Sequence, residues 1–199
     1  MTLDLVLALF LFAFVSSITP GPNNVMLLSS GLTFGFRRTI PHMAGVCLGH
    51  AAMVLVIGLG LGQLFERIPA FYTVLKVLGA AYMLYLAWRI ATSGTVEEGE
   101  ARARPLSFFQ AALFQWINPK GIVMAVTVVT LYTAESAYTF SVFVCGLAFL
   151  VTNTVSVTTW TAFGSVLLRR FLSDPVKVRW FNWTMAGLLV LSLIPMLWT

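Results

Sequence analysis

The sequence predicts an all-α integral membrane protein with six transmembrane helices. Of its 199 residues, 59% are hydrophobic and only 10% are charged, and the mean hydropathy is +0.90, far above the range of water-soluble domains. Six apolar runs reach the ~20 residues that a helix needs to cross the hydrocarbon core: 3–32, 39–63, 69–91, 107–132, 137–168 and 178–198. These runs are apolar on every side instead of alternating, which favours helices over the strands of a membrane β-barrel.

The first apolar run is interrupted by TPGP at 19–22, followed by Asn23 and Asn24. A proline removes one N–H donor and clashes with the carbonyl four residues earlier, so two prolines in four residues predict a broken helix. The run begins with Asp4 and has no Lys or Arg in its first residues. We therefore expect a helix of the mature protein here and not a secretion signal.

A break of this kind predicts polar backbone groups within the membrane. Pro22 suits the first position of a new helix, and the N–H groups of Asn23, Asn24 and Val25 would start that helix without acceptors. The carbonyls before the break, at residues 17–19, would be left without donors. A positive helix N-terminus beside unpaired carbonyls matches the carboxylate and the ammonium of a free amino acid.

The fourth run contains a second break, NPKG at 118–121, where Asn118 can cap a helix that begins at Pro119. The carbonyls of residues 115–117 would be unpaired before it. Lys120 lies about thirteen residues into the run, or ~20 Å at the helical rise, near mid-membrane. A charge at that depth costs ~3 kcal/mol or more and so indicates a functional site. A single proline is often only a packing kink, but paired breaks in two runs favour a binding site.

The polar segment 92–105 divides the chain into two halves of three helices. We place the first half at about 1–91, a cytoplasmic linker at 92–106 and the second half at about 107–199. Because each half crosses the membrane an odd number of times, related halves would form an inverted repeat. An offset of 98 residues superimposes Cys47 on Cys145 and the dipeptide at 25–26 on that at 123–124, which supports such a relation.

The basic residues set the expected orientation. Nine of the twelve fall beside the same set of loops, against Arg67 on the other side: Arg37, Arg38, Arg89, Arg102, Arg104, Arg169, Arg170, Lys177 and Arg179. The positive-inside rule then puts the loops after helices 1, 3 and 5 in the cytoplasm and both termini outside. The net charge of +5 is an orientation signal and does not indicate a nucleic-acid partner.

The remaining polar residues limit the substrate. All seven acidic residues fall at helix ends or in loops, so a lysine-sized cation would find no partner and a small neutral amino acid is favoured. Proton coupling would then depend on Lys120 or on His50 in helix 2, although a histidine in such a helix is more often a hydrogen-bonded interior residue. Lys76 in helix 3 is expected to lie nearer the membrane surface than Lys120. It can take part in proton coupling, or its long stem can let the ammonium reach the aqueous interface.

Small residues and cysteines are expected to serve packing. Gly31 with Gly35, Gly58 with Gly62 and the sequence GAAY at 79–82 let helices approach closely in lipid, within one bundle first and in a homodimer second. Cys47 and Cys145 form no CxxC pair and read as small apolar residues.

Four stretches together resemble one known family: TPGPNN at 19–24, GFRR at 35–38, LKVLGAAYMLYLAW at 75–88 and FQWINPKG at 114–121. They are similar to the LysE/RhtB superfamily of amino-acid exporters. The resemblance implies a bacterial inner-membrane protein with six helices, driven by the proton motive force, closest to the branch that exports homoserine, threonine, leucine, cysteine or O-acetylserine. It places substrate or gating roles on Thr19, Pro20, Gly21, Pro22, Asn23, Asn24, Asn118, Pro119 and Lys120.

Taken together, the sequence predicts a secondary active exporter whose partners are an amino-acid substrate, protons and the lipid bilayer, with no cofactor and no metal. Three alternatives remain: a passive channel, a membrane enzyme and a structural subunit. The enzyme is disfavoured because no HExxH, nucleophile elbow or P-loop is present. A channel would equilibrate its solute and ignore the proton gradient.

Overall fold

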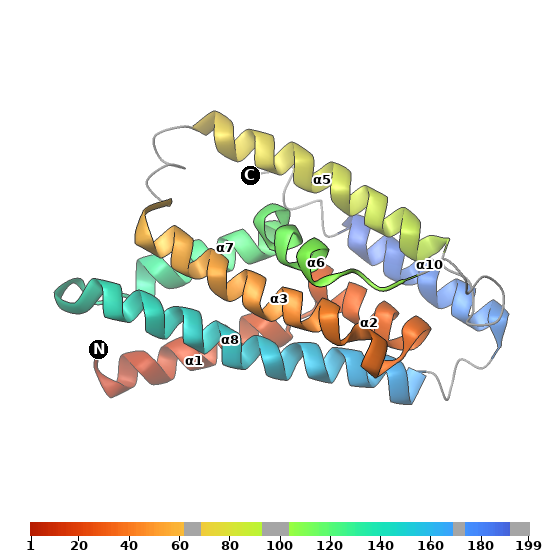
Figure 1. The fold of residues 1–199 in the computed structure, drawn as a ribbon, viewed down its shortest axis with the longest axis horizontal. Coiled ribbons are helices and arrows are strands. Elements are labelled where there is room, and N and C mark those ends of the chain that lie inside the picture. Colours follow the sequence, from red (N-terminus) through yellow and green to blue (C-terminus); the bar gives the residue numbers. More distant parts are fainter. Residues whose placement is uncertain (62–68, 93–103, 169–173, 192–199) are drawn as a thin grey trace.

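The computed structural model describes residues 1–61, 69–92, 104–168 and 174–191, and the regular elements among them are all helical. This confirms the all-α prediction for that part of the chain. The elements are α1 (Leu3–Ile18), α2 (Pro22–Phe34), α3 (Phe36–Val56), η1 (Ile57–Leu61), α5 (Pro69–Ala91), α6 (Phe108–Phe114), η2 (Gln115–Ile117), α7 (Pro119–Tyr132), η3 (Glu135–Ala137), α8 (Tyr138–Ala162), η4 (Phe163–Leu168) and α10 (Pro175–Leu191) (Figure 1).

Both predicted helix breaks are confirmed, and each new helix begins at a proline. The axes of α1 and α2 are bent by 55° across residues 19–21, and those of the α6–η2 segment and α7 by 69° at Asn118. Pro22 and Pro119 occupy the first helical position, where a missing N–H costs nothing because no intrahelical acceptor exists for it. The local chemistry of proline thus decides where α2 and α7 start.

The described residues contain two helices long and apolar enough to cross a membrane by themselves, Phe36–Gly60 and Glu135–Val166. The number rises to four if each bent pair is one span. The six-span arrangement predicted from the sequence therefore remains a prediction.

Two helices begin a few residues before the apolar runs that predicted them. The second run starts at about residue 39 and the sixth at about residue 178, whereas α3 begins at Phe36 and α10 at Pro175. A single residue, Gly35, joins α2 to α3, and its φ of 80° is the left-handed conformation that glycine adopts without steric cost. Arg37 and Arg38 consequently lie in the first turn of α3 and not in a loop.

Helix α8 packs against α1, α2 and α3, while α5 and α10 pair with each other along one edge of the bundle (Figure 1). Phe114 and Phe149 are among the largest fully buried side chains. In lipid, helices are held together by close packing. Two of the predicted small residues, Gly31 and Gly58, allow such packing between helices of this chain. A Cβ on Gly31 would overlap the backbone of Thr161, and one on Gly58 would overlap Val142.

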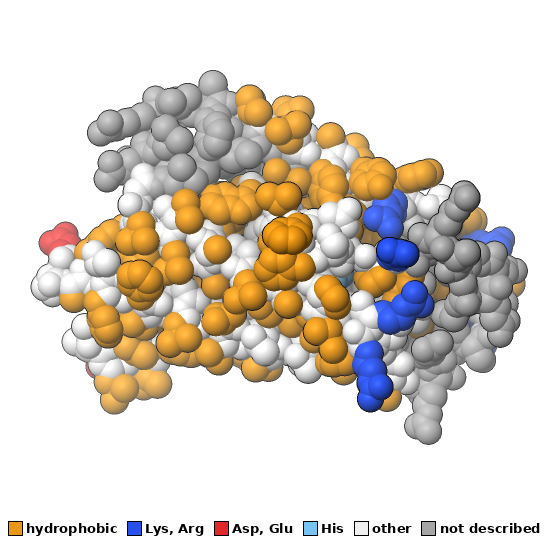
Figure 2. Space-filling view, in the orientation of Figure 1, with side chains coloured by type: hydrophobic (Ala, Val, Ile, Leu, Met, Phe, Trp, Pro, Cys, Tyr) orange, Lys and Arg blue, Asp and Glu red, His pale blue; other side chains and the backbone are white. Residues whose placement is uncertain are grey.

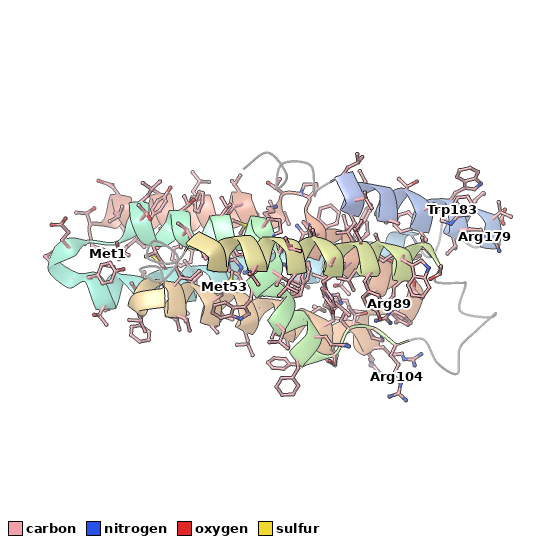
Figure 3. The ribbon with its side chains drawn as sticks, turned by 90° about the horizontal axis from the view of Figure 1, so that it is seen from above. Met1, Met53, Arg89, Arg104, Arg179 and Trp183 are labelled. Atoms are coloured by element: carbon pink, nitrogen blue, oxygen red, sulfur yellow. The ribbon has the colours of Figure 1, made fainter. Side chains whose placement is uncertain are left out.

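The surface has an apolar middle and a basic end. Large apolar side chains such as Phe109, Leu113 and Phe140 are more than 60% exposed, as expected of helices that face lipid. Figure 2 shows such side chains across the middle of one face, with Lys and Arg gathered toward one end. Arg89 and Arg104 lie at that end and Met1 at the other (Figure 3). We call the end that holds Arg89 and Arg104 the basic end.

Candidate functional site

The carbonyls at the end of α1 do not lack donors, which corrects the sequence prediction. The Asn24 side-chain amide, from the first turn of α2, donates through Nδ2 to the carbonyls of Ser17 and Thr19, both at 2.9 Å. The Ser156 hydroxyl donates to the Ser17 carbonyl at 2.8 Å. An unpaired backbone group is costly in the membrane interior. The Asn24 side chain avoids this cost by donating to both carbonyls across the break. Its side-chain nitrogen is therefore not a free donor for a substrate carboxylate.

Helix α8 contributes a second donor to the same break. The Trp160 indole donates through Nε1 to the Ile18 carbonyl at 3.1 Å. The Ser156 hydroxyl also lies 3.4 Å from the Asn24 side-chain oxygen. Helix α8 therefore contacts both the carbonyls of the break and the Asn24 side chain that pairs with them.

Lys120 joins the two breaks. Its ammonium, in the first turn of α7, donates to the Thr19 carbonyl at 2.6 Å and to the Pro20 carbonyl at 3.4 Å. The stem of the lysine passes over Gly21, where a Cβ would lie 2.8 Å from the Lys120 Cδ. Gly21 itself has extended backbone, φ −173°, so its requirement for glycine is one of space. A protein ammonium thus occupies the position predicted for a substrate ammonium.

The free amides at the start of α2 are fewer than predicted. The Val25 N–H donates to the Gly21 carbonyl at 3.0 Å, so the expectation that it would be free for a substrate was wrong. The Gly21 carbonyl accepts the first intrahelical bond, as the carbonyl of a helix-capping residue does. Only the N–H groups of Asn23 and Asn24 precede that bond.

A reciprocal amide pair ties the two breaks together. Asn23 donates through Nδ2 to Gln115 Oε1 at 2.8 Å, and Gln115 donates through Nε2 to Asn23 Oδ1 at 3.2 Å. Gln115 is fully buried and also donates to the Ala111 carbonyl at 2.8 Å. The bonds cross 92 residues of sequence and fix the start of α2 against the 3-10 turn before α7.

The second break differs from the prediction in its cap. Asn118 holds the capping position before Pro119, but its side chain makes no capping hydrogen bond. The backbone of Asn118 instead connects η2 to α7. Its N–H donates to the Gln115 carbonyl at 3.3 Å, and its carbonyl accepts from the Ile122 N–H at 3.0 Å. The Asn118 side-chain oxygen is buried without a partner.

A small cavity of about 20 Å³ lies where the breaks meet, which we call the break cavity. Three side chains in its wall carry a buried polar atom without a partner: His50 Nε2, Asn118 Oδ1 and Asn153 Nδ2. Each of these side chains is at most 7% exposed. Buried polar groups are nearly always paired, so three unpaired atoms around one cavity indicate a place that is filled by a ligand or by water. The remaining lining residues are Ser16, Ser17, Gly21, Pro22, Asn23, Asn24, Val46, Lys120, Gly121 and Met124.

The structure therefore gathers most of the predicted site residues at one place. Asn23, Asn24, Asn118, Lys120 and His50 line the cavity or bond across it. Thr19 and Pro20 contribute their carbonyls to Lys120, and Pro22 and Pro119 start the two helices. Lys76 belongs to α5, but its side chain lies outside the described part of the structure.

Sequence reasoning missed the polar residues of α8 and the Gln115 side chain. Asn153, Ser156 and Trp160 all come from α8 and face the break. The signal was present in the sequence as TNTVS at 152–156, a polar stretch inside an apolar run, since polar groups at membrane depth usually face a polar interior.

The described residues combine apolar helices, two broken helices and a polar cavity between the breaks, an arrangement typical of a membrane transporter. The chain belongs to the LysE type translocator family, whose family model matches residues 14–193. This confirms the resemblance seen in the motifs, and the membrane-enzyme alternative is excluded because the family and its relatives are transporters.

Curated relatives agree with this assignment. The chain is similar to the cysteine/O-acetylserine efflux proteins of Escherichia coli (strain K12), Shigella sonnei (strain Ss046) and Shigella flexneri. Each is 34% identical over 174 residues, which is 86% of this chain and 88% of the relative. No solved structure matches the chain.

Proposed function

We propose that this protein is a secondary active exporter that moves a small neutral amino acid from the cytoplasm to the periplasm in exchange for protons. The observation that carries the proposal is the break cavity, where free helix amides, an ammonium held on backbone carbonyls and three unpaired polar atoms meet. Its groups complement a carboxylate, an ammonium and a polar side chain.

The substrate class follows from what lines the cavity. Among the described lining residues none is acidic, which disfavours a substrate with a cationic side chain. The unpaired Asn118 oxygen and Asn153 nitrogen offer one acceptor and one donor, and such a pair favours a substrate that can hydrogen-bond through its side chain. Cysteine and O-acetylserine, which the relatives' names specify, are the first substrates to test.

Competition at the Thr19 carbonyl is the proposed basis of proton coupling. The protonated Lys120 amine donates to this carbonyl, and a substrate ammonium would need the same acceptor. If Lys120 loses its proton to the cytoplasm, it releases the carbonyl and the substrate binds. Once the substrate has left, a proton from the periplasm restores the lysine contact. His50, in the wall of the same cavity, is the second titratable group near this exchange.

The proposed transport cycle uses the inverted repeat predicted from the sequence, with halves 1–91 and 107–199 and six spans. A cavity of about 20 Å³ has room for about one water molecule, so an amino acid requires the bundle to open. Alternating access by rocking of the halves about the two breaks supplies that opening. In this scheme the protein lies in the bacterial inner membrane, with its basic end in the cytoplasm and its termini in the periplasm.

Uptake into inverted membrane vesicles tests the proposal, because their outer face is the cytoplasmic one. Labelled O-acetylserine, cysteine, homoserine, threonine, leucine and lysine are each supplied with and without an uncoupler, and vesicles without the protein are the control. We expect accumulation of one or a few polar neutral members, abolished by the uncoupler. Entry that only equilibrates would favour a channel, and no movement of any member would overturn the amino-acid assignment.

A further inference from the structure

A second and larger cavity lies at the basic end, between α2, α3, α5 and residues 104–106. Its volume is about 380 Å³, within the range of small-molecule sites. We call it the basic cavity. Its polar lining includes Ser29, Ser30, Thr33, His42, Arg89, Thr92 and Arg104.

Two arginines give this cavity its charge. Arg89, near the end of α5, donates to the Arg104 carbonyl at 3.2 Å and so holds residues 104–106 against the bundle. The described lining contains no acidic residue to neutralise either guanidinium. The planar fork of a guanidinium matches the two oxygens of a carboxylate, so the cavity suits an anionic group.

A buried histidine in the wall supports the presence of a polar ligand. His42 is fully buried, and its Nδ1 lies 3.3 Å from the Ser30 hydroxyl, while its Nε2 has no partner. The Thr33 hydroxyl oxygen is also buried and unpaired. An unpaired polar atom costs free energy when it is buried, and no described residue pairs with either atom.

Helix α2 connects the basic cavity to the break cavity. Asn23 lies at the start of α2 and Ser30 lies seven residues further on, which is about 10 Å at the helical rise. One helix therefore lines both cavities, with its free amides at the break and its later turns at the basic end.

We infer that the basic cavity is a separate capture site, at which Arg89 and Arg104 bind the carboxylate of the amino acid on the cytoplasmic side before it moves along α2 to the break cavity. The inference depends on the proposed function, which supplies the substrate and the direction. A bound anionic lipid headgroup would meet the same arginines and is the competing occupant to be separated by experiment.

Kinetics in inverted vesicles test the capture site. Arg104→Gln and Arg89→Gln remove one positive charge each, and we expect each to raise KM for the exported amino acid about tenfold, with kcat within about twofold of the original protein. Arg179→Gln is the matched control, because Arg179 is exposed on α10 and does not line the cavity. A merely structural role would lower kcat or the amount of protein instead.

The outcomes separate the two proposals. If the unmodified protein transports no amino acid, the proposed function fails. If it transports normally but both variants keep the original KM, the capture site is wrong. Proteoliposomes of phosphatidylcholine, with and without phosphatidylglycerol, decide between occupants. We expect the rise in KM in both, and a rise seen only with phosphatidylglycerol would overturn the inference in favour of a lipid site.

Discussion

Replacement of Lys120 by methionine tests the proposed exchange at the break. Methionine keeps an unbranched apolar stem over Gly21 but removes the ammonium that donates to the Thr19 carbonyl at 2.6 Å. A hydrogen bond from a charged group contributes about 1.5–3 kcal/mol. Removing this competitor should lower KM by roughly ten- to a hundredfold, at 1.4 kcal/mol per factor of ten.

Lys120→Met should also separate substrate binding from proton-driven accumulation. In inverted vesicles preloaded with unlabelled substrate, Lys120→Met should still exchange labelled for unlabelled substrate. With an imposed proton gradient and empty vesicles, it should no longer accumulate substrate. Lys177→Met, an exposed site on α10, is the control for loss of one positive charge. Full uncoupler-sensitive accumulation by Lys120→Met would refute the reasoning.

Three further predictions concern the packing around the site. Asn153→Leu removes an unpaired buried donor, so it should leave the thermal midpoint unchanged or higher while it reduces transport; a lower midpoint with unchanged transport would contradict this. Alanine at Asn23 and at Gln115, alone and together, should show a coupling of about 1–2 kcal/mol in unfolding, and strictly additive losses would rule out the amide pair. Gly31→Ala forces a methyl group onto the Thr161 backbone and should lower the thermal midpoint by several degrees, roughly 1–3 kcal/mol, whereas an unchanged midpoint would show that α2 and α8 are loosely packed at this contact.

The helix breaks could be predicted because proline acts locally. Pro22 and Pro119 lack the N–H that would continue a helix, so each starts a new one in the structure as predicted. The error at Val25 was also local. The carbonyl of the capping residue, Gly21, already accepts the first intrahelical bond, and helix geometry alone could have shown that this amide is used.

The side chains that complete the site are brought there by tertiary packing. The sequence of a single helix does not show which other helix it will meet. Ser156 and Trp160 reach the α1 carbonyls only because one face of α8 lies against the break. An amino-acid sequence shows that α8 carries polar residues, but the face they occupy and the partner they meet depend on how several helices cross. For the same reason, the Asn23–Gln115 pair joins segments 92 residues apart and had no local signal.

Proton movement caused by the substrate is the most direct test of the central claim. Inverted vesicles are given an acidic lumen by respiration, a pH-sensitive dye reports the lumen, and O-acetylserine or cysteine is added to the medium. The account predicts that the lumen becomes less acidic as protons leave in exchange for substrate, and that Lys120→Met vesicles show no such change. Accumulation of substrate without any change in lumenal pH would contradict proton exchange at the break.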